Sequence, residues 1–381
     1  MHGYCDVVVA GAGVIGASIG YHLAAEGHKV AVLDAKGPAA AASGACDGAV
    51  SVCSKKPGIM TRLAEKALEC CDDLSRPGRP LSGSFRKRPS YYFSASDVED
   101  QALDALVDRL GRSDGTVTVA SDRQGADVQG GFGGAVRRVV EVAGEGHMLG
   151  YAAVAAFLRA HTIDRLWPCS TQGFDASEGR VRIHTDRGVL EAGYLVLATG
   201  MATKTLLPHL PIFPRSGQLI VTERSGEATR LRGALTAATY LMTKRGSNDN
   251  VPNPPIVVDP LDTGQYLIGS TREDGGDAQR TDFASVKRLL SHALACYTPL
   301  SRLRVIRVFS GVRAAVSDGL PIVGTLPEMP RVIVATGFEG DGICLAPLIG
   351  REVASLIGCG AVSGDLGRLS PHRFCEEREA V

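Results

Sequence analysis

The segment from Asp6 to Asp34 restricts the possible folds of this chain more than any other part of the sequence. An apolar run leads into a G-x-G-x-x-G turn and a stretch with apolar residues at helical spacing, and a second apolar run then ends in an acid. Short apolar runs of this kind are typical of parallel strands that are buried on both faces. The segment therefore predicts a strand–helix–strand unit.

The glycines of the turn each have a physical task. Gly11 permits a tight turn, Gly13 lets the backbone approach a pyrophosphate, and Gly16 lets the helix pack closely on the strand. The helix N-terminus offers N–H groups and a positive dipole end to phosphates, and Asp34 can accept a hydrogen bond from a ribose hydroxyl. A glycine turn alone also occurs without a ligand, but these parts in this order predict a bound dinucleotide.

Composition argues against several classes of protein. With 381 residues, of which 44% are hydrophobic and 22% charged, the chain resembles an ordinary globular protein and can hold two domains. The formal net charge is zero and no basic cluster is dense, so neither nucleic acid nor an anionic membrane is an expected partner. No apolar run reaches the length of a membrane span, and the first strand begins too early to leave room for a signal peptide. The ten cysteines show no metal spacing, so we expect free thiols, no metal site and a cytoplasmic location.

Hydrophobic periodicity predicts an alternation of helices and strands after Asp34. Helices are expected at 59–74, 98–110, 149–160, 283–295 and 343–357. Strands are expected at 91–93, 180–185, 189–191, 194–198 and 332–335, and antiparallel strands within PIFPRSGQLIVTE, TYLMTKRG and GQYLIGSTRE. The Pro/Asn-rich stretch from Asn248 to Pro255 is expected to be a loop.

Three further segments favour a ligand at the carboxyl ends of the parallel strands. The small residues from Ala39 to Ala49 predict a backbone lying tightly against the ligand, with a flexible loop as the alternative. The strand that ends at Thr199 and Gly200 reaches the sheet edge where ligands gather in α/β folds. The Gly337–Gly342 turn also precedes a helix, whose N-terminus suits the electron-rich end of a flavin.

The chain twice leaves the nucleotide sheet for other strands, which predicts two interleaved domains. We assign residues 1–84, 146–210 and 301–381 to a nucleotide-binding α/β domain. Residues 85–145 and 211–300 are assigned to a second domain built on an antiparallel layer.

Taken together and in this order, the motifs resemble those of the FAD-dependent D-amino-acid oxidase family over essentially the whole chain. The resemblance rests on the N-terminal turn with Asp34, the ATG strand end, the P-x-R-x-G-Q strand, and G-x-R…DGLPIVG followed by ATGFEGDGICLAP. That family includes glycine and sarcosine oxidases, opine and proline or hydroxyproline dehydrogenase subunits, and the hydrogen cyanide synthase subunit. ACDGAVSVCSKKPG and GFEGDGI are most similar to the opine-oxidase, hydroxyproline-dehydrogenase and cyanide-synthase branch.

The resemblance implies an α/β fold of two domains. Residues 1–84, 146–210 and 301–381 would form an FAD-binding Rossmann-like domain of the glutathione-reductase type with noncovalent FAD, and residues 85–145 and 211–300 a substrate-binding domain with a mixed or antiparallel sheet. Relatives that attach the flavin through a cysteine carry it at the position of Gly311, and no histidine occurs between Asp34 and Gly58. The residues expected to contact FAD are Gly11, Gly13, Val14, Ile15, Gly16, Asp34, Ala35, Ser43, Ala45, Cys46, Gly48, Ala49, Thr199, Gly200, Gly311, Arg313, Gly337, Phe338, Glu339, Gly340, Asp341, Gly342 and Ile343.

The reaction implied by the resemblance removes a hydride from the carbon next to an amine, and the imine then hydrolyses to a keto acid and an amine. Arg313 matches the family arginine that binds the substrate carboxylate, a task that suits a guanidinium, although the next residue is Ala314 where relatives commonly have proline. Tyr240 lies where relatives place a tyrosine at the site. A surface salt bridge is the alternative for Arg313, and a core aromatic position for Tyr240.

Other polar residues near these motifs are open to more than one interpretation. Glu339 and Asp341 could contact the flavin or merely cap the following helix. His147 is expected to be a cap or surface residue at a loop-to-helix junction, and no general base is assigned.

The implied substrate is a small amino acid, N-substituted amino acid, opine or imino acid, with O₂ or a partner subunit as the electron acceptor. Two alternatives remain: oxidation of the C–OH bond of a 2-hydroxy acid by the same fold, and a flavoprotein subunit that is inactive without its partners. Homo-oligomers and hetero-oligomers are both compatible with the sequence.

Overall fold

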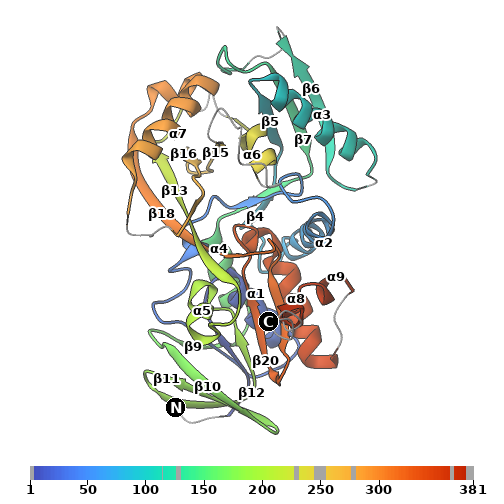
Figure 1. Cartoon of the computed structure of the whole chain (residues 1–381), viewed down its shortest axis with the longest axis vertical. Coiled ribbons are helices and arrows are strands. Elements are labelled where there is room, and N and C mark those ends of the chain that lie inside the picture. Colours follow the sequence, from blue (N-terminus) through green and yellow to red (C-terminus); the bar gives the residue numbers. More distant parts are fainter. Residues whose placement is uncertain are drawn as a thin grey trace, which may run out of the picture.

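The computed structural model describes residues 4–113, 115–125, 130–226, 231–243, 255–275, 280–360 and 364–374. Two large sheets, each with its own helices, lie at opposite ends of the molecule (Figure 1). The two long strands β13 (Ile212–Thr222) and β18 (Val305–Val316) pair with each other and run between these ends. This arrangement confirms the predicted two-part α/β architecture.

The first sheet contains the predicted parallel strands of the N-terminal unit. Its eight strands are β1 (Cys5–Ala10), β2 (Val30–Leu33), β9 (Asp164–Leu166), β10 (Thr171–Ser177), β11 (Arg180–Thr185), β12 (Gly188–Leu197), β19 (Ile322–Leu326) and β20 (Met329–Thr336). The strands β20, β12, β1, β2 and β9 run parallel to one another. Val7 and Val9 belong to one hydrophobic cluster and Val8 and Ala10 to another, so β1 is buried on both faces as its apolar run predicts.

A layer of helices covers one face of this sheet. It consists of α1 (Val14–Ala25), α2 (Ile59–Leu74), α4 (Gly150–Ala160) and α8 (Gly342–Cys359). The α8 helix packs against both α1 and α2, and the Ser18 hydroxyl in α1 donates to the Ala346 carbonyl at 2.7 Å. A Cβ added at Gly350 would lie 2.3 Å from the Ser18 Oγ, so this glycine sets the close approach of the two helices.

The second sheet is mixed and lies in the upper half of Figure 1. Its nine strands are β5 (Ser90–Ser94), β6 (Thr118–Gln124), β7 (Arg138–Ala143), β13, β14 (Leu235–Ala237), β15 (Val257–Pro260), β16 (Tyr266–Gly269), β17 (Glu273–Asp274) and β18. The helices α3 (Asp97–Gly111), α6 (Ala238–Thr243) and α7 (Phe283–Cys296) accompany it. Only the β5–β14 pairing among the described pairs of this sheet is parallel.

A small three-stranded sheet connects the segment after Asp34 to the crossovers between the two large sheets. It consists of β3 (Ala49–Val50), β4 (Phe85–Lys87) and β8 (Gly146–Met148). The remaining short helices are η1 (Ala42–Gly44), η3 (Gly200–Ala202), α5 (Thr203–Leu206), η5 (Thr298–Arg302), α9 (Gly364–Gly367) and η6 (Pro371–Phe374). The small sheet places β3 beside the cavity described below.

Several elements differ from the sequence-based prediction. The stretch TYLMTKRG is not a strand over its described part, because β14 ends at Ala237 and α6 follows with good helix formers such as Leu241 and Met242. Most of the predicted loop from Asn248 to Pro255 lies outside the described residues. The strand β6 was not predicted, since its alternating exposure carries few apolar residues.

Two differences concern the strands that cross between the large sheets. The predicted strands at 189–191 and 194–198 form one strand, β12, which pairs with β11 over its first half and with β1 and β20 over its second half. The β18 strand pairs with β13 in the second sheet, although the predicted boundary assigns residues 301–381 to the nucleotide-binding domain. The domain boundaries themselves stay a prediction.

The α8 helix is long and apolar enough to cross a membrane by length and composition, and within the described residues it alone meets that test. Ile343, Leu345 and Val353 are among its many buried side chains. Such burial is typical of a core helix, which passes the same test of length and composition.

Candidate active site

The turn before α1 is held by close backbone contacts. Gly11 has φ +109°, and a Cβ at this position would lie 2.3 Å from the Ala198 carbonyl oxygen. A Cβ at Gly16 would lie 1.9 Å from the Gly11 carbonyl oxygen, which confirms the predicted close packing of helix on strand. The Ser43 hydroxyl accepts a hydrogen bond from the Val14 N–H at 2.9 Å. A side chain 29 residues downstream thus caps the helix whose N-terminus is expected to face phosphate.

The Asp34 carboxylate stabilises the same turn through hydrogen bonds. One of its carboxylate oxygens accepts from the Ala12 N–H at 2.9 Å, and the other accepts from the Lys36 and Gly37 N–H groups at 2.8 Å each. A carboxylate has about four acceptor sites, so three of them are already used. The contact of Asp34 with a ribose hydroxyl stays a prediction.

The small-residue segment after Asp34 is packed against three parts of the protein. The Ala39 N–H donates to the Ala12 carbonyl at 2.9 Å, and a Cβ at Gly150 in α4 would lie 2.0 Å from the Ser43 carbonyl oxygen. On the other side, a Cβ at Gly311 in β18 would lie 2.8 Å from the Ala45 Cβ. These contacts favour the tightly held backbone over the flexible loop.

The Cys46 thiol lies within this segment and donates to the Ser43 carbonyl at 3.2 Å. Burial, with a smaller effect of the Asp47 charge, raises the pKa of Cys46 to about 12. The thiol therefore stays protonated at neutral pH and is a poor nucleophile. This protonation supports the predicted noncovalent attachment of the flavin.

The glycine-rich turn before α8 is held by ion pairs. The buried Lys55 ammonium contacts the Asp341 carboxylate at 2.9 Å, and Glu339 pairs with Arg272 at 2.7 Å and with Arg215 at 3.4 Å. Asp341 occupies the N-cap position of α8 without a side-chain cap bond, so side-chain capping is the wrong alternative for it. Burial opposes the charged form of Lys55, but the Asp341 carboxylate outweighs this effect and raises the pKa of Lys55.

The remaining predicted contact residues lie at the same edge of the first sheet. The Thr336 hydroxyl donates to the Gly200 carbonyl at 3.0 Å, which ties the ends of β12 and β20 together. Thr199 lies two residues after the end of β12, Phe338 is buried, and Gly342 and Ile343 begin α8. Two helix N-termini and the small-residue segment therefore surround one edge, which fits the elongated dinucleotide FAD.

Arg313 projects from β18 and is held by neutral groups. One guanidinium nitrogen donates to the Ser270 hydroxyl at 2.7 Å, and the other is 3.4 Å from the carbonyl oxygens of Ser216 and Thr271. A Cβ at Gly340 would lie 3.5 Å from Arg313 Nε, so the side chain passes along the turn before α8. No carboxylate among the described residues forms an ion pair with Arg313, and the surface salt bridge is therefore not observed.

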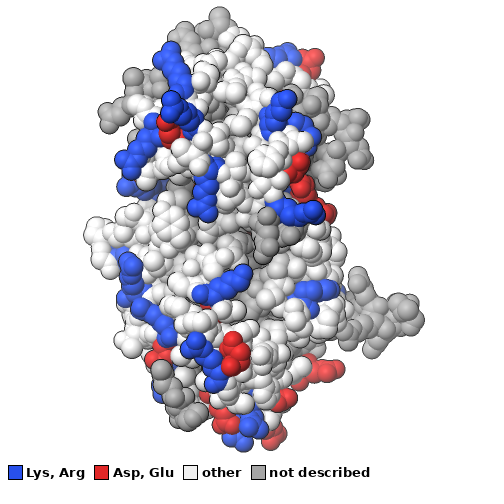
Figure 2. Space-filling model, turned by 90° about the vertical axis from the view of Figure 1, so that its left-hand side faces the viewer, with Lys and Arg blue, Asp and Glu red and all other residues white. Residues whose placement is uncertain are grey.

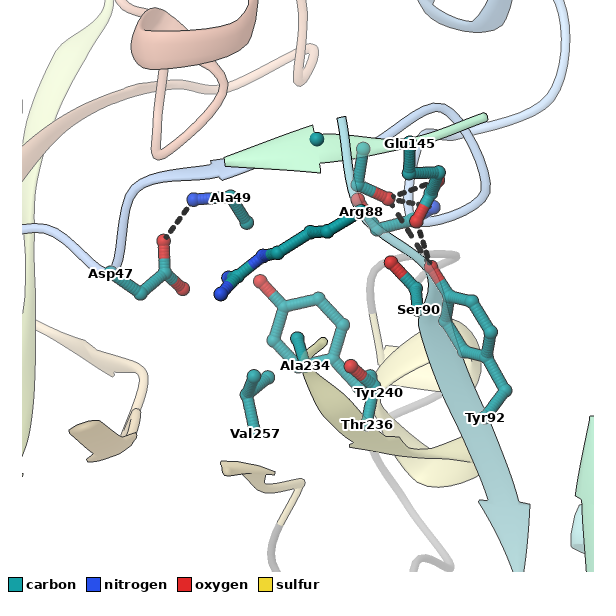
Figure 3. Close-up of a pocket in the computed structure, with 13 residues that line it drawn as sticks. Asp47, Ala49, Arg88, Ser90, Tyr92, Glu145, Ala234, Thr236, Tyr240 and Val257 are labelled. Atoms are coloured by element: carbon teal, nitrogen blue, oxygen red, sulfur yellow. Dashed lines mark hydrogen bonds between the residues drawn. The ribbon is translucent and has the colours of Figure 1, made fainter. Parts of the chain in front are cut away.

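Tyr240 lines a polar cavity between the small sheet and the second sheet (Figure 3). The cavity encloses about 430 Å³, including the solvent at its mouth. Its lining consists of Asp47, Ala49, Ser51, Ser54, Arg88, Ser90, Tyr92, Glu145, Gly146, Ala234, Thr236, Tyr240 and Val257. Tyr240 is thus half-buried at a cavity wall instead of filling a core, whereas Arg313 does not line this cavity.

Three charged side chains in or next to the wall of this cavity were not predicted. Arg88 contacts Asp259, and Glu145 is fully buried and accepts hydrogen bonds from the Ser51 hydroxyl and the Val52 and Cys53 N–H groups. Burial raises the pKa of Asp259, although Arg88 opposes this effect. The partners of these charges are up to 171 residues away, so no local sequence pattern could have revealed them.

His147 differs from its predicted place at a surface or helix cap. It is buried on β8, and its Nε2 atom lies 2.9 Å from the Asp47 carbonyl oxygen and 3.8 Å from an Asp259 carboxylate oxygen. The pairing of Ala49 with His147 across the small sheet brings the ring into this position. Among the described residues, no three potential metal ligands gather at one place.

Known proteins resemble the chain over nearly its full length. Glycine oxidase of Bacillus licheniformis is 24% identical over 368 residues, which cover 92% of each chain. The hydrogen cyanide synthase subunit HcnC of Pseudomonas aeruginosa is 24% identical over 99% of this chain and 98% of the relative. The crystal structure of glycine oxidase from Geobacillus kaustophilus has a TM-score of 0.85 at 22% identity, covering 97% of this chain and 98% of that chain. A family model described as FAD dependent oxidoreductase matches residues 6–356, and the chain therefore belongs to this family of FAD-dependent oxidoreductases.

Proposed function

We propose that this enzyme removes a hydride from the carbon next to the amine of a small amino acid, N-substituted amino acid, opine or imino acid. The resulting imine would hydrolyse to a keto acid and an amine. The observation that carries the proposal is Arg313, whose charge has no carboxylate partner among the described residues and whose side chain passes along the turn before α8. Glycine oxidase among the relatives supports an amino acid as the substrate.

Arg313 would bind the carboxylate of the substrate. The Ser270 hydroxyl and two carbonyl oxygens fix the guanidinium without neutralising it, so its positive charge can attract an anion. A held carboxylate orients the adjacent Cα–H bond, and orientation of this kind accounts for much of an enzyme's rate. Bound FAD supplies the hydride acceptor.

Tyr240 would cover the substrate from the side of the second sheet, because its phenol lines the cavity beside Asp47 and Ala49 (Figure 3). No strong base is needed if the amine binds in its neutral form. Electrons would pass on to O₂ or to a partner subunit. The similarity to a hydrogen cyanide synthase subunit supports the partner subunit as the alternative acceptor. None of the nine described cysteines forms a disulfide bond, in keeping with a reducing cytoplasm as the proposed location.

An anaerobic reduction experiment tests the proposal. The holoenzyme is mixed with amino acids, N-methyl amino acids and 2-hydroxy acids without oxygen, and bleaching of the flavin absorbance identifies a true substrate. Bleaching by amines alone supports the proposal, whereas bleaching by 2-hydroxy acids alone refutes it in favour of C–OH oxidation.

The substitution Arg313→Leu tests the role of the guanidinium. The apparent affinity for carboxylate substrates should fall about tenfold to a hundredfold, because a charge-assisted hydrogen bond is lost while FAD is retained. Arg307→Leu on the same strand is the matched control, since this arginine stacks on Phe309. Unchanged affinity in Arg313→Leu would refute the assigned role.

A further inference from the structure

An acidic residue of the protein, Glu339, lies beside Arg313 at the turn before α8. The Glu339 N–H donates to the Ala314 carbonyl at 3.0 Å, and a Cβ at Gly340 would lie 3.5 Å from the Arg313 Nε atom. Glu339 has φ +43°, in the left-handed region that residues other than glycine rarely adopt. The turn thus places a carboxylate of the protein next to the arginine that is proposed to bind a carboxylate of the substrate.

Two other arginines bind the Glu339 carboxylate. Arg272 contacts it at 2.7 Å, and Arg215 contacts it at 3.4 Å. Arg215 is shared, because its guanidinium also donates to the Asp274 carboxylate at 2.5 Å and 3.1 Å. Arg272 forms no ion pair with any other described residue, so it is the stronger of the two contacts of Glu339.

Both of these arginines adjoin Arg313. Arg215 lies directly opposite Arg313 in the pairing of β13 with β18, so the two side chains leave the same face of the sheet. Arg272 follows Thr271, whose carbonyl oxygen is 3.4 Å from the Arg313 Nη1 atom. The Glu339 carboxylate is therefore bound between two immediate neighbours of Arg313.

The Arg313 guanidinium itself is fixed by neutral groups. It lies over Gly217 in β13, where a Cβ would be 2.6 Å from Nη1 and 2.7 Å from Nη2. The buried Ser270 hydroxyl accepts from Nη2 at 2.7 Å. Arg313 thus stays in place with its charge available, and the side chain that can change its partner is Glu339.

The contacts of Arg272 favour a functional role over a purely stabilising one. Its Nη1 atom is buried and has no hydrogen-bond partner within the described part of the chain. A buried donor without a partner costs free energy, and most buried donors in proteins have one.

Anions are attracted to this end of the molecule. Lys and Arg side chains gather in the upper half of the side that Figure 2 shows, with fewer acidic side chains among them. Residues 280–307 include six Lys and Arg residues and a single acid, Asp282. A positive field of this kind raises the local concentration of anionic ligands, and it also attracts any carboxylate of the protein that is not held elsewhere.

We propose that Arg272 is a positioning residue that holds the Glu339 carboxylate away from Arg313 and so leaves the Arg313 guanidinium open to the substrate. Without Arg272, the Glu339 side chain would turn toward Arg313 and compete with the substrate carboxylate. Arg215 replaces Arg272 only in part, because Asp274 shares its guanidinium. The inference rests on the proposed function and deepens it.

Binding of propionate to the FAD-loaded full-length protein measures how open Arg313 is. A shift of the flavin absorbance reports binding, and propionamide is the matched ligand of the same size without the charge. The wild type should bind propionate more tightly than propionamide by about tenfold. Arg272→Gln should remove most of this preference and leave the affinity for propionamide unchanged. The FAD content of each variant is measured first, so that only loaded protein is compared.

A second variant separates this role from an effect on folding. In Arg272→Gln/Glu339→Gln the competing carboxylate is absent, so the preference for propionate should return to at least the wild-type value. Arg272→Lys keeps a cation for Glu339 and should retain most of the preference. Arg307→Gln is the matched control, because it removes the same charge from β18 at a residue that stacks on Phe309. A merely structural role for Arg272 would leave the double variant as weak as the single one.

The outcomes separate this inference from the proposed function. If amino acids bleach the flavin but Arg272→Gln keeps its preference, or the double variant does not regain it, the role of Arg272 is overturned and the proposed function is kept. A preference that is lost in Arg272→Gln and restored in the double variant, without bleaching by any amine, supports the role of Arg272 and refutes the proposed function. A wild type that binds propionate no better than propionamide also overturns the inference.

Discussion

The turns before α1 and α8 look alike in sequence, since both are glycine-rich and both follow a buried parallel strand. The first is held by backbone contacts, with Gly16 against Gly11 and the Asp34 carboxylate bonded to three N–H groups. The second is held by side-chain charges, with Asp341 on Lys55 and Glu339 on Arg272. The same local pattern can therefore be stabilised in two ways, and the second relies on ion pairs with distant parts of the chain.

The largest loss of stability is expected when the Lys55–Asp341 ion pair is broken. Lys55→Met leaves the Asp341 carboxylate, whose side chain is 13% exposed, without its partner, which should lower the free energy of unfolding by about 3–5 kcal/mol. Urea denaturation of the holoenzyme measures this loss. The double variant Lys55→Met/Asp341→Asn should recover much of the stability, and a double variant as unstable as Lys55→Met would contradict an ion-pair role.

A smaller effect is expected at the first turn. Gly16→Ala places a methyl group 1.9 Å from the Gly11 carbonyl oxygen, so the backbone must shift, at a cost of about 1–3 kcal/mol. Thermal unfolding together with the retained flavin absorbance measures the change. Gly111→Ala at the end of α3 is the control, since a Cβ there meets nothing within 4 Å. Equal stability of the two variants would show that the first turn is not held by backbone packing.

The smallest effect on stability at neutral pH is expected at the contact between α1 and α8. His22 in α1 lies against Gly350 in α8, and burial, with a smaller effect of the Arg351 charge, lowers the pKa of His22 to about 4. His22 takes up a proton near pH 6.5 in the unfolded chain but only near pH 4 in the folded chain. The contribution of the neutral His22 ring to the free energy of unfolding is therefore complete above pH 6.5 and is lost as the pH falls toward 4.

Denaturation at several pH values measures that contribution. His22→Gln should flatten the stability profile between pH 6.5 and 4. A slope that is the same in wild type and His22→Gln would assign the acid sensitivity to other groups.

Local patterns predicted much of the fold and part of the site. The apolar runs, the glycine turns and the helix periodicities were sufficient for β1, α1, β2, β20 and α8, because each signal lies within about 15 neighbouring residues. Arg313 was found through the family motif, and the lack of a carboxylate partner for it within the described part of the chain agrees with the role implied by the resemblance. TYLMTKRG was assigned wrongly because its mixture of Tyr, Leu and Thr suits a strand or a helix.

The sequence by itself determined that a nucleotide-binding sheet forms, that two glycine turns open onto its carboxyl edge, and that an arginine follows in β18. Only the tertiary structure decided that β18 joins the second sheet, that Lys55 meets Asp341 across 286 residues, and that Arg88 meets Asp259 across 171. The physical reason is the separation along the chain over which each interaction acts. Periodicity and turn chemistry act between neighbours, whereas a buried charge finds its partner only after distant segments have packed together.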